Sequence, residues 1–251
     1  MTAIGPEAVV ATFVLFCRIG ACLLLMPGFS SPRVPPQVRL FLAIGITLVL
    51  APLLLPNVQD TVNGMPPEGL ATLIVSELMI GATIGILGQL FFMALETIGT
   101  AVTMAIGYGP VPGTAIEGSQ PQPALVSLLT LSAVVLLFIT GQYWEVLRGL
   151  TASYSTMPVA QLFSAQIALS RVTGVLADSF LLSLRIASPF IIYAVIVNFA
   201  IGLTNKLTPQ IPVYFISLPF VLGGGLLLLY FTAPEMLHLF MDGFASWLRQ
   251  G

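Results

Sequence analysis

Long apolar runs separated by short polar segments dominate the pattern along the chain. A membrane-spanning helix needs about 17 to 25 consecutive apolar residues, and runs of this length occupy residues 8–26, 38–55, 123–140, 180–204 and 212–232. A further apolar stretch, 70–106, is too long for one upright span and predicts a strongly tilted or broken helix, or two helices. The pattern therefore predicts six hydrophobic elements, or seven if 70–106 forms two.

The segments between these runs differ in kind. Residues 27–37 contain four prolines, which excludes a helix running through them, and residues 56–69 are predicted to form a short polar link. Residues 107–123 hold four glycines and four prolines in seventeen positions, so we expect an irregular loop there. Residues 145–178, the most polar part, are predicted to form an amphipathic approach to the next helix.

The C-terminal segment 234–249 has a helical pattern with one apolar face. That face carries Leu237, Phe240, Phe244, Trp247 and Leu248, whereas other positions carry Glu235, His238 and Asp242. This distribution predicts a helix that lies at a membrane interface or packs against a partner.

The composition restricts the class of protein. The chain has 251 residues, of which 57% are hydrophobic and 7% charged, against about 25% charged in an average soluble domain. A soluble domain of this size would lack a polar surface. We therefore predict an all-α polytopic membrane protein with about six hydrophobic helices.

The charges argue against some partners and leave the orientation open. A net charge of −2 without a Lys/Arg run disfavours nucleic acid or anionic lipid as the main partner. The N-terminus carries Glu7 where a signal peptide would be basic, so no cleaved signal peptide is expected. Six spans distribute the basic residues evenly between the two sides, whereas seven give a five-to-one bias.

Three ionisable residues lie inside apolar runs, where they are costly. Arg18 is at the centre of the first run, and a lone Arg there costs about 2.5–3.5 kcal/mol. Glu77 and Glu96 raise the same problem in the stretch 70–106. Interhelical pairing is one interpretation, and a proton or ion relay is the other, although a relay would need more clustered ionisable groups.

A second set of charges recurs every seven residues and lies along one helix face: Arg171, Asp178 and Arg185. A solvated face is one interpretation of this stripe, and docking onto an acidic neighbour is the alternative. Arg185 enters an apolar run, so we expect it to pair with a carboxylate of the chain or of a partner.

Catalytic and cofactor motifs are absent from the sequence. One histidine, His238, is too few for a histidine metal cluster, and no HExxH, GxSxG or Walker-type segment occurs. Cys17 and Cys22 have neither a CxxC nor a metal-ligand spacing. Gly107-Tyr108-Gly109 begins like a dinucleotide-binding fingerprint but continues into Pro110. We expect no enzyme activity and no cofactor.

The composition of the loop 107–123 favours a closure element of a conduit over an ordinary turn. A loop that fills a narrow channel and then moves aside needs small residues, a bulky stopper and few charges. The relevant residues are Gly107, Tyr108, Gly109, Pro110, Pro112, Gly113 and Glu117, the last being the loop's single charge.

The order of the glycines, prolines and polar residues along the chain resembles that of the FliR family of flagellar biosynthesis proteins. The virulence-secretion relatives of this family form the SctT family. The long stretch carries Glu77, Gly81 and Gly85, similar to the family's Glu-x-x-x-Gly-x-x-x-Gly run, followed by Gly99 and Gly107. Ser153-Tyr154 and Pro158 follow the fourth apolar run. The strongest stretch comprises Pro189, Asn198, Gly202, Pro209, Gln210, Pro219 and Gly225.

The resemblance implies a specific architecture and function. It implies a FliP-like N-terminal part over 1–160 and a FliQ-like helical hairpin with a C-terminal amphipathic helix over 161–251. It also implies a core subunit of the flagellar type III export gate in the bacterial inner membrane, at the flagellar basal body. The implied partners are FliP, FliQ, FlhB, exported flagellar subunits in transit and membrane lipid.

From their positions in the helices, Arg18, Glu77, Asp178 and Arg185 are candidates for charges that support assembly, and Gly81, Gly85 and Gly202 for close helix packing. Two alternatives stay open. An SctT-type virulence secretion subunit would have the same architecture, and a small-molecule secondary transporter would use broken helices around midplane charges.

Overall fold

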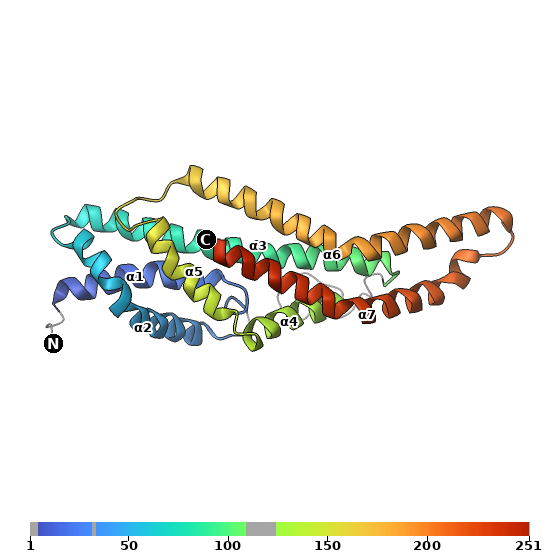
Figure 1. The fold of residues 1–251 in the computed structure, drawn as a ribbon, viewed down its shortest axis with the longest axis horizontal. Helices are drawn as coiled ribbons and strands as arrows, with labels where there is room; N and C mark the ends of the chain where they lie inside the picture. Colours follow the sequence, from blue (N-terminus) through green and yellow to red (C-terminus); the bar gives the residue numbers. More distant parts are fainter. Residues whose placement is uncertain (1–4, 32–33, 109–123, 251) are drawn as a thin grey trace. The chain divides into compact units, whose positions relative to one another are not determined.

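The computed structural model describes residues 5–31, 34–108 and 124–250. Seven α-helices follow one another, and the described residues contain no β-strand. The helices are α1 (Pro6–Leu25), α2 (Pro36–Val62), α3 (Pro67–Ala105), α4 (Ala124–Ile139), α5 (Tyr143–Thr156), α6 (Ala165–Leu207) and α7 (Val213–Gln250) (Figure 1). The predicted all-α fold is confirmed.

Proline and glycine mark the helix boundaries. The helices α1, α2 and α3 begin at Pro6, Pro36 and Pro67, where the missing N–H of proline costs no hydrogen bond. Gly64 follows α2 and Gly107 follows α3, both with a positive φ (77° and 78°). This left-handed conformation ends a helix at low cost only in glycine.

Five helices are long and apolar enough to cross a membrane, namely α1, α2, α3, α6 and α7. The pair α4 and α5 would be a sixth if it forms one broken span. The predicted polytopic membrane protein with about six apolar helices is therefore confirmed. The alternative of two helices over 70–106 is wrong, because α3 is one continuous helix of 39 residues.

The predicted polar link 56–69 is also wrong for most of its length. Helix α2 continues through Pro52 and Pro56 to Val62, and only residues 63–66 connect it to α3. Each proline removes one backbone hydrogen bond, but Val58 and Val62 are buried, so packing favours the helical continuation.

The polar region 145–178 and the C-terminal segment differ in part from the prediction. Residues 157–164 interrupt the region 145–178 and separate α5 from α6. The C-terminal segment is part of α7, which passes through Pro219 and Pro234. Its predicted faces are observed: Phe240, Phe244 and Leu248 are buried, whereas Glu235, His238 and Asp242 are exposed.

The chain divides into two compact units. Unit 1 comprises residues 1–91, 141–176 and 245–251, and unit 2 comprises 92–140 and 177–244. The helices α3, α6 and α7 each contribute to both units. The core of unit 1 contains α1 residues such as Val14, Leu15 and Ile19. In unit 2, Phe92 packs edge-to-face against Phe240 and Phe244, with ring centroids 5.2 and 5.7 Å apart.

Candidate functional site

A buried ion pair lies at the centre of unit 1. Arg18 of α1 and Glu77 of α3 are both inaccessible to solvent, with side-chain exposures of 0%. The guanidinium binds the carboxylate through two bonds, Nε to Oε2 and Nη2 to Oε1, each 2.6 Å long. This bidentate geometry is the strongest arrangement of an arginine–carboxylate pair. The structure therefore brings two of the predicted charges together across two helices.

Helix α5 and the residue after it complete the surroundings of Arg18. Nη1 donates to the backbone oxygen and the Oγ of Ser153, at 3.2 and 3.3 Å, and Nη2 donates to the backbone oxygen of Met157 at 3.0 Å. The Tyr154 ring lies beneath the guanidinium, 4.1 Å from Cζ to the ring centroid, as in a cation–π contact. Five hydrogen bonds thus match the five N–H donors of the guanidinium.

The ion pair fixes α1, α3 and α5 relative to one another. Two charges removed from water are tolerated only where their hydrogen-bonding groups are satisfied, and loss of one partner costs about 3–5 kcal/mol. This geometry is that of interhelical pairing. A role of Arg18 and Glu77 in assembly with other subunits stays a prediction.

Glycines of α3 let α1 approach closely beside this pair. A Cβ atom at Gly81 would overlap the backbone oxygen of Arg18, and one at Gly85 would lie 2.7 Å from the backbone oxygen of Cys22. Both α1 residues and both α3 residues are four positions apart, so each pair occupies one helix face. The glycines form a groove that receives the α1 backbone just beyond the ion pair.

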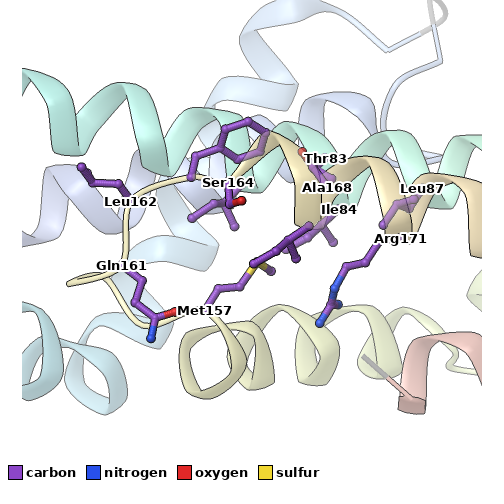
Figure 2. A pocket seen from close by; sticks show the side chains of 12 residues that line it. Thr83, Ile84, Leu87, Met157, Gln161, Leu162, Ser164, Ala168 and Arg171 are labelled. Atoms are coloured by element: carbon purple, nitrogen blue, oxygen red, sulfur yellow. The ribbon is translucent and has the colours of Figure 1, made fainter.

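The connector 157–164 between α5 and α6 contacts α3 in unit 1. The backbone N–H of Phe163 donates to the Oγ of Ser76 on α3 at 2.7 Å. Behind it lies a cavity of about 50 Å³, lined by α3, the connector and the first turns of α6, with Arg171 among its lining residues (Figure 2). A cavity of this size holds water or a methyl-sized group and is too small for a larger ligand.

The charges Asp178 and Arg185 lie in unit 2, and both are exposed on α6. Neither forms an ion pair within the ranges that the structure describes. Arg171 belongs to unit 1, where it is half-buried. The pairing proposed for Arg185 stays a prediction.

The residues of the strongest resemblance lie on the hairpin of α6 and α7. Pro189 is half-buried within α6, and exposed Asn198 donates to the backbone oxygen of Ala194 at 2.8 Å. A Cβ atom at Gly202 would meet no atom within 4 Å, so its predicted packing against another helix stays a prediction. Pro209 and Gln210 are exposed in the turn between the two helices.

The first residues of the loop 107–123 are described and the rest are not. Ile106 is fully buried and packs where Gly225 of α7 leaves space for its side chain. The backbone N–H of Tyr108 donates to the backbone oxygen of Thr103 at 2.9 Å. The other candidate closure residues lie outside the described residues: Gly109, Pro110, Pro112, Gly113 and Glu117.

Two contacts of the structure were not predicted from the sequence. The Tyr154 ring was not expected on Arg18, and the hydroxyl of Tyr193 on α6 donates to the backbone oxygen of Val221 on α7 at 2.7 Å. The only signal for the second is a tyrosine in an otherwise apolar run. Such a residue usually finds a partner for its hydroxyl when buried.

Comparisons with known proteins match nearly the whole chain. It is 27% identical over 238 residues to the flagellar biosynthetic protein FliR of Caulobacter vibrioides, covering 93% of this chain and 92% of the relative. It is 28% identical to FliR of Escherichia coli, with 90% and 87% coverage, and 26% identical to the Yop proteins translocation protein T of Yersinia pestis, with 89% and 85% coverage. The family described as bacterial export proteins, family 1, matches residues 9–247. The chain therefore belongs to this family of bacterial export proteins.

Proposed function

We propose that the chain is a non-enzymatic core subunit of the flagellar type III protein export gate. In this proposal it forms part of the conduit through which flagellar subunits cross the bacterial inner membrane at the flagellar basal body. The observation that carries the proposal is the match to bacterial export proteins over residues 9–247. Similarity along nearly full length to proteins named FliR supports the flagellar assignment.

The exposed surface supports an assembly of several subunits. The hairpin of α6 and α7 exposes large apolar side chains, including Phe199, Phe215, Phe220 and Tyr230, each more than 70% exposed. Surfaces of this kind need lipid or partner helices to cover them. The proposed partners are FliP and FliQ in a hetero-oligomeric gate, with FlhB adjoining it and exported subunits passing through.

Two finer parts of the proposal rest on the resemblance and the loop composition. Residues 1–160 would correspond to a FliP-like part and 161–251 to a FliQ-like hairpin with the C-terminal helix. The loop 107–123 would close the conduit when no subunit is in transit. Gly107 and Tyr108 begin this loop at the end of α3.

A virulence-type secretion subunit is the second candidate function. It is supported by 26% identity to the Yop proteins translocation protein T over 236 residues. The two candidates share the membrane fold and differ in the proteins that pass through the gate.

Deletion of the gene and complementation with the unchanged chain test the proposal. The flagellar gate predicts loss of swimming and loss of flagellar subunits from the culture medium, both restored by complementation. Affinity purification of a tagged chain in mild detergent is expected to retain two other small hydrophobic proteins. Normal swimming after deletion, with loss of other secreted proteins, would support the virulence-type candidate instead.

A further inference from the structure

Two exposed arginines of unit 1 converge on one carboxylate. Nη1 of Arg148 lies 3.2 Å and Nη2 of Arg249 lies 3.7 Å from the same atom, Oε1 of Glu145. The Glu145 side chain is 18% exposed, whereas those of Arg148 and Arg249 are 77% and 67% exposed. The three groups together carry a net charge of +1. One carboxylate therefore holds two guanidiniums side by side and leaves donors of both directed to the surroundings.

The position of this cluster is fixed by packing beneath it. Val146 and Leu150 are buried on the inner face of α5. A Cβ atom at Gly149 would lie 3.2 Å from the backbone oxygen of Leu248, so the last turn of α7 lies against α5. Arg148 on α5 and Arg249 on α7 are thus held on packed helices of unit 1.

Aromatic residues adjoin the cluster at the start of α5. Trp144 is 57% exposed and its ring lies 5.2 Å from that of Tyr143. Trp144 and Arg148 are four residues apart and share the outer face of the helix. Tryptophan, tyrosine and arginine occur together where a membrane protein meets the headgroups of the lipids.

We infer that Trp144, Arg148 and Arg249 form a binding site for the headgroup of an anionic phospholipid. Arginine is suited to phosphate because its planar fork presents parallel N–H donors to two oxygens. Trp144 would lie at the level of the headgroups, beside the upper part of the acyl chains. The chain as a whole has a net charge of −2, so the attraction is local to this cluster. The inference is independent of what the protein exports.

Fluorescence quenching of Trp144 tests this site directly. The chain contains two tryptophans, and Trp247→Phe leaves Trp144 as the reporter. The full-length chain is reconstituted in phosphatidylcholine vesicles that contain a minor fraction of either brominated phosphatidylglycerol or brominated phosphatidylcholine. One net positive charge near the surface attracts an anionic lipid by about 1 kcal/mol, which corresponds to roughly fivefold enrichment. We therefore expect clearly stronger quenching by the brominated phosphatidylglycerol.

Three variants and one competitor separate the site from a general charge effect. Arg148→Gln with Arg249→Gln is expected to remove the preference, whereas Arg148→Lys with Arg249→Lys keeps the part that charge alone supplies and loses the part that the planar fork supplies. Arg185→Gln with Lys206→Gln removes the same charge elsewhere and is expected to keep it fully. Inorganic phosphate is expected to change the quenching no more than sodium chloride of the same ionic strength does, since both salts screen the charges equally.

Four results would overturn the inference. In the chain with both arginines, the two lipids could quench equally, or neither could quench. The preference for phosphatidylglycerol could persist in the double glutamine variant. It could also be lost in phosphate but kept in sodium chloride of the same ionic strength. The last result would assign the cluster to a soluble phosphate compound.

Discussion

Arg18 places a positive charge in the middle of an apolar helix, and its surroundings compensate that charge completely. Its guanidinium has the Glu77 carboxylate, three oxygens of α5 and the following connector, and a tyrosine ring. Arg18, Glu77, Ser153 and Tyr154 are buried and Met157 is half-buried, so little of this site is open to solvent. The site therefore depends on both charged partners being present together.

Replacement of one charge should consequently be worse than replacement of both. Arg18→Met leaves Glu77 buried without its cation and is expected to reduce the free energy of unfolding by about 3–5 kcal/mol. Arg18→Met combined with Glu77→Leu is expected to recover much of that loss. Thermal unfolding in detergent measures the difference, with the exposed Lys206→Met as a control that changes stability by less than about 0.5 kcal/mol. A single variant as stable as this control would contradict a structural role of the pair.

The sequence indicates interhelical pairing for Arg18, Glu77 and Glu96 but does not decide which of them meet. The presence of Arg18 and Glu77 in apolar runs was recognised because buried charges need partners. Their separation by 59 residues meant that the register between α1 and α3 decided whether they met. That register depends on the glycine groove, and on Ser153 and Tyr154, whose helix could not be placed beside α1 from periodicity.

At the scale of helices, glycines have opposite roles at two positions. Gly81 faces the α1 backbone, and a Cβ atom there would overlap the backbone oxygen of Arg18. Gly202 of α6 faces open space. The same residue type therefore serves close packing in one helix and has no neighbour within the described chain in the other.

The substitution Gly→Ala separates these roles. Alanine favours a helix over glycine by about 1 kcal/mol, so Gly202→Ala is expected to raise the unfolding temperature of the purified chain slightly. Gly81→Ala gains the same propensity but forces α1 away from α3, and we expect a net decrease. Circular dichroism melts of the two variants give the comparison. An equal increase in both would show that α1 is not closely packed at Gly81.

Proline inside an apolar run was a poor guide to helix ends, although proline marks the starts of α1, α2 and α3. Residues 56–69 were predicted as a link, yet α2 continues through Pro56 to Val62, and α6 and α7 run through Pro189 and Pro219. A proline inside a helix costs about 3 kcal/mol or more, yet long apolar helices continue through all of these positions. Gly64 and Gly107 have a positive φ and lie just after α2 and α3, a backbone conformation that glycine adopts without strain.

The loop 107–123 is an element whose role rests on composition, and deletion tests it. Removal of residues 110–118 is expected to make the membrane leaky to small ions, since the closure element would be missing, and Tyr108→Ala is expected to be a milder version. Ion efflux from cells that assemble the variant at normal level is the measurement. Wild-type permeability with normal assembly would make the loop a simple connector.

For the whole molecule, the length of three helices limits how the chain can lie in a bilayer. Helices α3, α6 and α7 have 39, 43 and 38 residues, and at 1.5 Å per residue each is about 57–65 Å long. The hydrocarbon core of a bilayer is about 30 Å thick. An upright helix of this length extends about 27–35 Å beyond the lipid tails, and in the proposed assembly partner subunits cover that excess.

Arg185 allows the proposed contact with partner proteins to be tested. It is exposed on α6 between apolar residues, where an unpaired charge in an assembly would be costly. Arg185→Leu is expected to reduce the yield of the complex with its partner proteins, as measured by co-purification. Lys206→Leu, at the C-terminal end of α6, removes the same charge and is expected to have a smaller effect. Equal yields from both variants and the unchanged chain would contradict a carboxylate partner for Arg185.

The buried ion pair also has a consequence for the time at which the chain is made. Helix α1 leaves the ribosome with Arg18 at its centre, but Glu77 is synthesised 59 residues later. At about 5–20 residues per second, this delay is roughly 3–12 seconds. During that interval Arg18 has no carboxylate partner. Its position at the helix centre makes insertion of α1 into the bilayer less favourable by about 2.5–3.5 kcal/mol. This penalty on the insertion of α1 is therefore expected to last until the third helix supplies Glu77.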